Sequence, residues 1–298
     1  MLKNILDTMP CYNVFTYWFY PVAETPNMWS VIAKNEPSIE IGTVDDKLTP
    51  NSFPEIMLSE GHSDKLDEIS IQFKLFTQRP EYVVRRPVAS INILDQASLI
   101  EEYEVRLVGI IFNRVINAGK NPDDNISSAM HCIDWLRSTD FYNAPGSTQY
   151  HDSEPSGLLK HSLRVFNHII RLRNDEAFQS VSVYSAALVA LTHDWCKIGL
   201  YELYMRNVKN DETGKWEQVP SYRHNQKGIP LGHGVTSMFL VSKFFKLSSA
   251  EALALRWHMG EYNVAHNEQN DLHLANETTP LVFLVQFADR LAIAKYAN

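Results

Sequence analysis

The stretch SVYSAALVALTHDWCK, residues 182–197, decides the fold that we expect. Its first part is apolar and rich in small residues, which is typical of a helix packed closely on several sides. The helix leads into the dipeptide His193-Asp194, which sets an imidazole beside a carboxylate in apolar surroundings. Burying both groups costs free energy unless a partner compensates them. A divalent cation is such a partner, because it binds neutral histidine and ionised aspartate together.

Histidines and aspartates recur on apolar segments through the second half of the chain. We predict five consecutive helices there, and each carries such a residue: His161, the pair His193-Asp194, His233, His258 and Asp289. Each residue alone is a weak signal, and an isolated histidine on an apolar stripe is better explained as a buried, hydrogen-bonded side chain than as a ligand. Together they offer six nitrogen and oxygen ligands without cysteine, which suits two divalent first-row metals. Only a helical bundle could gather ligands so far apart in sequence.

The segments between these helices are also predictable. Residues 201–208 and 215–222 flank a turn-forming cluster, so we expect a β-hairpin, either a lid over a site or a solvated excursion. A capping-box pattern at Ser248 starts the helix of His258, and Pro280 starts the last helix. Residues 261–279 are expected to form a polar loop whose two histidines, at 266 and 273, lie on the surface.

The first third of the chain has a different character. Ile69 to Phe76 alternates apolar and polar residues, which predicts a half-buried strand, and residues 81–84 could form a second. Asp95 can cap a helix that ends near Gly119, and another helix is expected over 126–136. We therefore divide the chain into a small α/β or β-containing module of unknown role, residues 1–94, and a mainly α domain, residues 95–298.

The composition of the chain argues against some classes of protein. The 298 residues carry a formal net charge of −8, which disfavours a broad nucleic-acid surface without excluding a local basic groove. The cysteines, Cys11, Cys132 and Cys196, form no metal or disulfide pattern, and Cys196 reads as a small buried residue rather than a nucleophile. Without a long apolar run or a secretion signal, we expect a cytoplasmic protein that does not enter a membrane. The oligomeric state is left open.

Taken in order, the motifs resemble those of the HD-domain metal-dependent phosphohydrolases. The resemblance covers about residues 140–295, and the motifs are Gly157-Leu-Leu-Lys-His161, His193-Asp194-Trp-Cys-Lys-Ile-Gly199, Gly-His233-Gly, His258-Met-Gly and Ala-Asp289-Arg. Residues 144–161 resemble the HD-domain 3′→5′ exoribonucleases and HD proteins of phages and gut bacteria. The resemblance implies an HD-domain helical bundle with the β-hairpin inserted in it.

The same resemblance assigns roles to residues. It implies that His161, His193, Asp194 and Asp289 hold one metal, and that Asp194 bridges to a second held by His233 and His258. The metals would be two divalent ions (Mn, Fe, Co, Ni or Zn), and a hydroxide bridging them would attack phosphorus.

Other residues are candidates for binding the substrate. Lys197 matches the lysine of the HDxxK motif and would bind a phosphate oxygen, or it is an ordinary lysine at a helix C-terminus. Arg290 and His151 are further candidates for substrate binding. Trp257, beside His258, reads as a core residue rather than a platform for a base.

The motifs and the composition leave three candidate functions. The leading one is hydrolysis of a nucleotide or similar small phosphoester. The alternatives are a 3′→5′ exonuclease acting on single-stranded RNA or DNA, and a non-catalytic metal-binding module that serves in interactions.

Overall fold

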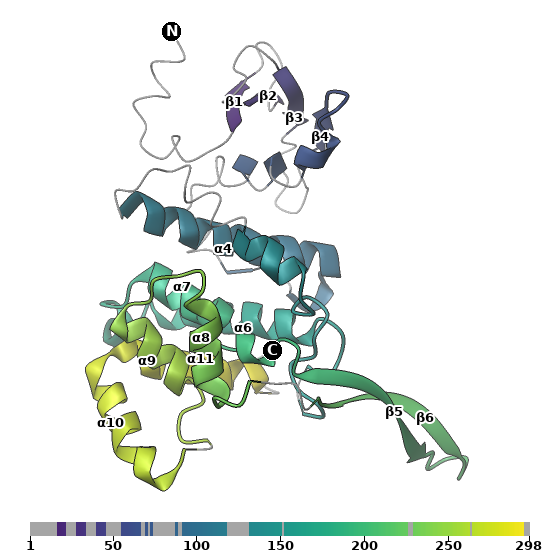
Figure 1. Cartoon of the computed structure of the whole chain (residues 1–298), viewed down its shortest axis with the longest axis vertical. Helices are drawn as coiled ribbons and strands as arrows, with labels where there is room; N and C mark the ends of the chain where they lie inside the picture. Colours follow the sequence, from purple (N-terminus) through teal and green to yellow (C-terminus); the bar gives the residue numbers. More distant parts are fainter. Residues whose placement is uncertain are drawn as a thin grey trace. The chain divides into compact units, whose positions relative to one another are not determined.

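The protein is described by a computed structural model. The residues it describes are 17–21, 28–33, 40–45, 55–66, 69–70, 72–73, 87–88, 91–117, 131–150, 152–225, 229–262 and 264–294. The chain divides into two compact units, Met1–Val84 with Glu104–Met130, and Arg85–Tyr103 with His131–Asn298. Helices predominate among the described residues, so the protein is mainly α (Figure 1). None of these helices is both long and apolar enough to cross a membrane.

The first unit contains a four-stranded antiparallel sheet in the order β1-β2-β3-β4. Its strands are β1 (Tyr17–Pro21), β2 (Met28–Ala33), β3 (Glu40–Asp45) and β4 (Glu55–Leu58). A bulge between Val31 and Ile32 shifts the register of β2 against β3. Buried side chains of the sheet form a small core of their own with Ile69 and Phe73.

The strand predicted over residues 69–76 is wrong where the structure describes it. Residues 69–70 and 72–73 are helical. Ile69 and Phe73 are both buried in the core of the sheet, and a spacing of four puts them on one helical face as well as on one face of a strand. The alternation therefore could not distinguish the two structures. The strand expected over residues 81–84 lies outside the described residues.

Helix α4 (Gln96–Asn117) begins where it was predicted. The Oδ1 atom of Asp95 accepts a hydrogen bond of 2.8 Å from the backbone N–H of Ser98, which is an N-cap. The boundary between the two compact units falls within this helix, after Tyr103. Of the helix expected over 126–136, the structure describes only residues 131–136, which are helical.

The second unit is a set of packed helices that carries all the candidate ligands. Its helices are α6 (Gly157–Leu172), α7 (Val183–Thr192), α8 (His233–Val241), α9 (Ser249–Trp257), α10 (Gln269–Thr278) and α11 (Pro280–Ile293). Helix α6 packs on α7 and α11, and α9 packs on α8 and α11. The interior of α7 is fully buried, as its small apolar residues predict. The predicted capping box of α9 and the N-terminal proline of α11 are both confirmed.

The loop predicted over residues 261–279 is wrong, because the 3₁₀ turn η6 (His266–Glu268) and helix α10 occupy much of it. In α10 only Leu272 and Ala275 are buried, and two apolar positions three apart are too few to reveal a helical period. The histidines at 266 and 273 are exposed, as expected.

The predicted β-hairpin is confirmed. Strands β5 (Tyr201–Lys209) and β6 (Trp216–His224) pair antiparallel from Tyr201 opposite His224 to Lys209 opposite Trp216. The hairpin extends away from the helices (Figure 1). Most of its side chains are exposed.

A glycine fixes the distance between α8 and α9. A Cβ atom on Gly234 would lie 2.1 Å from the carbonyl oxygen of Arg256, a backbone atom that cannot move aside alone. Gly234 follows His233, and Arg256 lies two residues before His258. The absent side chain therefore lets two candidate ligands approach each other.

Gly234→Ala should lower the free energy of unfolding by about 1–3 kcal/mol, because the added methyl group forces α8 away from α9. Thermal or urea denaturation followed by circular dichroism measures the change. Gly214→Asn is the control, since Gly214 lies in the hairpin turn with φ +68° and open space around it, a conformation that asparagine tolerates. Equal stability of Gly234→Ala and the parent would show that the helices do not depend on this close approach.

Candidate metal centre

His193 and Asp194 lie at the junction between α7 and the 3₁₀ turn η5 (Trp195–Lys197), and both are buried. Hydrogen bonds hold this junction from two sides. The Tyr103 hydroxyl donates to the carbonyl of Leu191 at 2.7 Å and accepts from the indole N–H of Trp195 at 2.9 Å. The backbone N–H of Cys196 donates to the Ser237 hydroxyl of α8 at 3.0 Å. These hydrogen bonds therefore fix the position of the backbone around His193 and Asp194.

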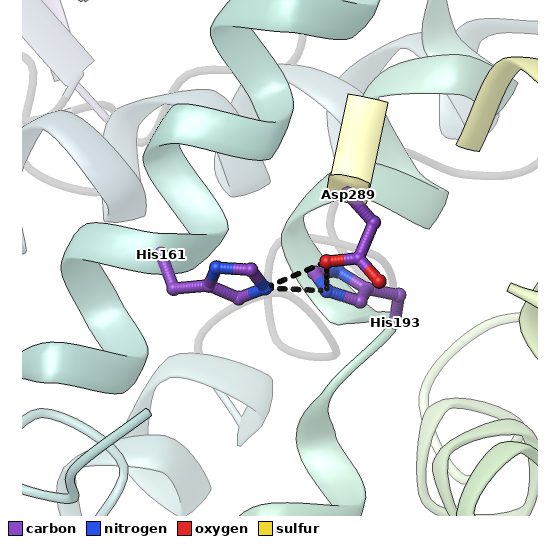
Figure 2. A group of neighbouring side chains, drawn as sticks. All are labelled: His161, His193 and Asp289. Carbon is purple, nitrogen blue, oxygen red and sulfur yellow. Dashed lines mark hydrogen bonds and ion pairs between the residues drawn. The ribbon is translucent and has the colours of Figure 1, made fainter. Parts of the chain in front are cut away.

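One group of ligand atoms gathers around His161 on α6. Its Nε2 atom lies 3.2 Å from Nε2 of His193 and 3.1 Å from Oδ1 of Asp289 (Figure 2). The same nitrogen is 3.4 Å from Oδ2 of Asp194. Ligands about 2.1 Å from one metal are about 3.0 Å apart in an octahedron and about 3.4 Å apart in a tetrahedron. The spacing therefore matches the edges of a coordination shell, and the group could hold a metal ion.

The other oxygen of Asp194 belongs to a second group. Its Oδ1 lies 2.8 Å from Nε2 of His233 and 3.6 Å from Nε2 of His258. One carboxylate thus faces both groups, with His161 and His193 at Oδ2 and the other two imidazoles at Oδ1. The structure therefore brings the six predicted ligands together around Asp194.

Two of the imidazoles are oriented by their own helices. Nδ1 of His193 lies 2.8 Å from the carbonyl of Ala190, and Nδ1 of His258 lies 2.8 Å from the carbonyl of Leu255. A carbonyl only accepts, so the proton sits on Nδ1 and the lone pair of Nε2 faces the centre. In the described part of the chain, Nε2 of His258 is buried without a hydrogen-bond partner. A buried acceptor in this state is what a cation would satisfy.

The ionisable groups influence one another strongly. Burial raises the pKa of Asp194, but Lys197 and His193 outweigh it and hold that pKa well below its ordinary value. Burial lowers the pKa of His193, yet the carboxylate of Asp194 leaves it raised overall. The pKa of His258 is lowered, mainly by burial, which favours the neutral imidazole that binds metals.

The pKa values of His233 and Asp289 are shifted in the same way, by burial on one side and by neighbouring groups on the other. Burial lowers the pKa of His233, but Cys196 and Asp194 outweigh it and raise the pKa to about 10. Burial raises the pKa of Asp289, but the hydrogen bond and charge of His161 leave it lowered overall. Protons and cations therefore compete for the same imidazoles, while the carboxylates stay ionised.

Lys197 is buried against the centre. Its Nζ atom lies 2.7 Å from Oδ2 of Asp194 and donates to the carbonyl of Gly146 at 2.7 Å. Burial lowers the pKa of Lys197, but the carboxylate of Asp194 outweighs it and leaves the pKa raised. The ammonium therefore compensates the charge of the central carboxylate.

A cavity of about 620 Å³ opens onto the centre. Lys197 and four of the candidate ligands line it: His161, Asp194, His233 and Asp289. Its other walls come from the 146–150 loop, the foot of the hairpin and the C-terminal end of α9, and carry the aromatic residues Tyr150, Tyr201, His224, Trp257 and Tyr262. The volume lies within the range of small-molecule sites, about 300–1,000 Å³.

The remaining predicted residues lie less close to the centre. Arg290 is exposed on α11 and is not among the residues that line the cavity. His151 lies outside the described residues. Trp257 is 6% exposed, and the guanidinium of Arg256 lies 3.9 Å above its ring.

Two residues near the centre were not predicted to contribute to it. Cys196, expected to be a buried filler, is buried but also places its Sγ 3.3 Å from Nδ1 of His233. Oδ2 of Asp152 lies 3.9 Å from Nδ1 of His161. Asp152 stands in a loop without periodicity, so only its nearness in sequence to Gly157 and His161 could have drawn attention to it.

Comparison of the chain with protein-family models, with curated proteins and with solved structures found no match. The assignment of a function therefore depends on the motifs and on the geometry of the centre.

Lys197→Met should lower the free energy of unfolding in a chelator by about 3–5 kcal/mol, because it leaves the buried carboxylate of Asp194 without its ammonium partner. Denaturation with EDTA and with added Mn²⁺ or Zn²⁺ measures the effect. A cation bound to Asp194 replaces the missing charge, so the loss should be smaller with metal.

Lys160→Met is the matched control. Lys160 pairs with Glu154 at 2.6 Å in a more exposed setting, so its loss should cost at most about 1 kcal/mol. If the two variants unfolded alike, Lys197 would not be compensating a buried charge.

Proposed function

We propose that the chain is an HD-domain metal-dependent phosphohydrolase that hydrolyses a nucleotide or a similar small phosphoester. The observation that carries this proposal is the position of Asp194, whose two carboxylate oxygens face separate groups of histidines. A carboxylate shared in this way is suited to two cations a few ångströms apart, and paired cations are common in phosphoester hydrolysis.

The proposed fold is the HD-type helical bundle, with its motifs between residues 140 and 295. Three features support it. The candidate ligands occur in the order of the family's motifs, the helices that carry them pack against one another, and the hairpin is inserted between η5 and α8.

The donor set fits divalent cations. One ion would be held by His161, His193, Asp194 and Asp289, and a second by Asp194, His233 and His258. Nitrogen and carboxylate ligands suit Mn²⁺, Fe²⁺, Co²⁺, Ni²⁺ or Zn²⁺. Such ions, when bound, lower the pKa of water and neutralise charge on phosphate oxygens.

The chain's own residues would bind and enclose the substrate. Lys197 presents an ammonium at the cavity wall, where it would bind a phosphate oxygen as well as Asp194. Tyr150, Tyr201 and Tyr262 of the outer wall would supply flat aromatic surfaces for the remainder of the substrate. The helices bury four of the candidate ligand side chains, which excludes bulk water from their rear faces: His161, His193, Asp194 and His258.

Asp194→Ala and His193→Ala should lose bound metal and lose hydrolysis down to the uncatalysed rate, because each removes a ligand from the shared centre. Metal analysis of the purified protein and a chromogenic phosphodiester assay with Mn²⁺ measure the two losses. Circular dichroism should show nearly unchanged helical content.

His168→Ala is the control for the loss of an imidazole. It lies on α6 like His161, is half-buried, and lies outside the ligand groups, so activity should be retained. Hydrolysis by Asp194→Ala at the parent's rate would overturn the proposal.

A panel of substrates would define the activity further. It would contain nucleoside mono-, di- and triphosphates, cyclic dinucleotides, and short single-stranded RNA and DNA. Preference for the small substrates supports the proposal. Preference for single strands, with binding that weakens steeply with salt, would favour the exonuclease. Retained metal with no hydrolysis of any of them would favour the interaction module.

A further inference from the structure

Asp152 has a strained backbone that its neighbours hold in place. Its φ of +53° lies in the left-handed region, which residues other than glycine seldom adopt. Its carbonyl accepts a hydrogen bond of 2.8 Å from the N–H of Gly146. A Cβ atom on Gly157 would lie 2.0 Å from the same oxygen, so the loop closes only because that residue is glycine. Strain of this kind persists where the surroundings fix it, and it is common at functional sites.

The side chain of Asp152 is held between two residues of α6. Its Oδ1 atom forms an ion pair with the guanidinium of Arg164. Its Oδ2 atom lies 3.9 Å from Nδ1 of His161 and, among the described residues, is buried without a hydrogen-bond partner. The carboxylate therefore presents a free acceptor toward the rear of a candidate metal ligand.

His161 differs from the other two buried imidazoles in what lies behind it. His193 and His258 each donate from Nδ1 to the carbonyl three residues earlier in the chain. For His161 that carbonyl belongs to Leu158, and it accepts from the hydroxyl of Ser162 at 2.9 Å. The carboxylate of Asp152 occupies the corresponding place behind the His161 ring.

We propose that Asp152 is a positioning residue of the metal centre. Its carboxylate would accept a hydrogen bond from the Nδ1–H group of His161 when Nε2 of that histidine binds a cation. This inference rests on the proposed metal-dependent function. The present separation is about 1 Å longer than a hydrogen bond, a gap that a small rotation of either side chain closes. A carboxylate behind a ligating imidazole fixes its tautomer and strengthens its donation to the metal. The ion pair with Arg164 orients the carboxylate.

The test is the affinity of the purified full chain for Co²⁺ or Mn²⁺, measured by titration after metal removal. Asp152→Ala should weaken binding about 10–100-fold. Asp152→Asn keeps an acceptor oxygen but loses the charge, so its affinity should fall between those of the parent and Asp152→Ala.

Glu154→Gln is the matched control. Glu154 is a carboxylate of the same loop, and it pairs with Lys160 of the same helix. The side chain of Glu154 is exposed, so its loss should leave the affinity unchanged.

A second measurement separates positioning from a structural role. In the metal-loaded parent, the Nδ1 proton of His161 should be protected from exchange in imidazole NMR spectra, and in Asp152→Asn it should exchange faster. Lower thermal stability of the metal-free variants with parental metal affinity would assign Asp152 to the loop alone and overturn the inference. Failure of the parent itself to bind metal would instead overturn the proposed function.

Discussion

The carboxylate of Asp194 is the group on which the second unit depends. It is buried, ionised and surrounded by four imidazoles whose Nε2 atoms lie within 3.6 Å of its oxygens. A charge taken out of water in this way is tolerated only when opposite charge and hydrogen bonds replace the lost hydration. Lys197 supplies one such charge, and the histidines supply the rest by holding protons or by holding cations.

The surrounding helices are arranged to keep these groups facing one another. Gly234 allows α8 and α9 to approach at backbone distance, which sets the separation of His233 and His258. Tyr103 and Ser237 both form hydrogen bonds to the segment that runs from the end of α7 into η5. Each of these contacts involves a residue within two positions of a candidate ligand, so the packing of the helices also fixes the geometry of the site.

The sequence predicted those parts in which one local signal dominates. The small apolar residues of α7, the capping box at Ser248 and the turn between β5 and β6 each have one plausible structure, and the structure has it. The candidate ligands could be picked out from the sequence because several weak signals occurred in a fixed order. The strand predicted at residues 69–73 was wrong because a spacing of four between apolar residues fits a strand as well as a helix. Helix α10 was missed because so little of its surface is apolar.

Contacts made from outside the periodic segments left no sequence signal. Asp152 reaches His161 only because Gly146 and Gly157 fold the loop back on itself, which is a three-dimensional condition. Cys196 was correctly expected to be buried, but its contact with His233 depends on where α8 lies. Such residues become visible only once the distances are known.

The candidate ligands span 129 positions of the chain, from His161 to Asp289, and the last of them lies on the final described helix. No partly folded form that lacks α11 contains the complete centre. An ion bound there would therefore draw its affinity from the cooperative folding of the entire helical unit, and would stabilise that unit by mass action in return. The metal would then be bound only when the whole helical unit is folded, so an incompletely folded or damaged chain would lack the complete centre.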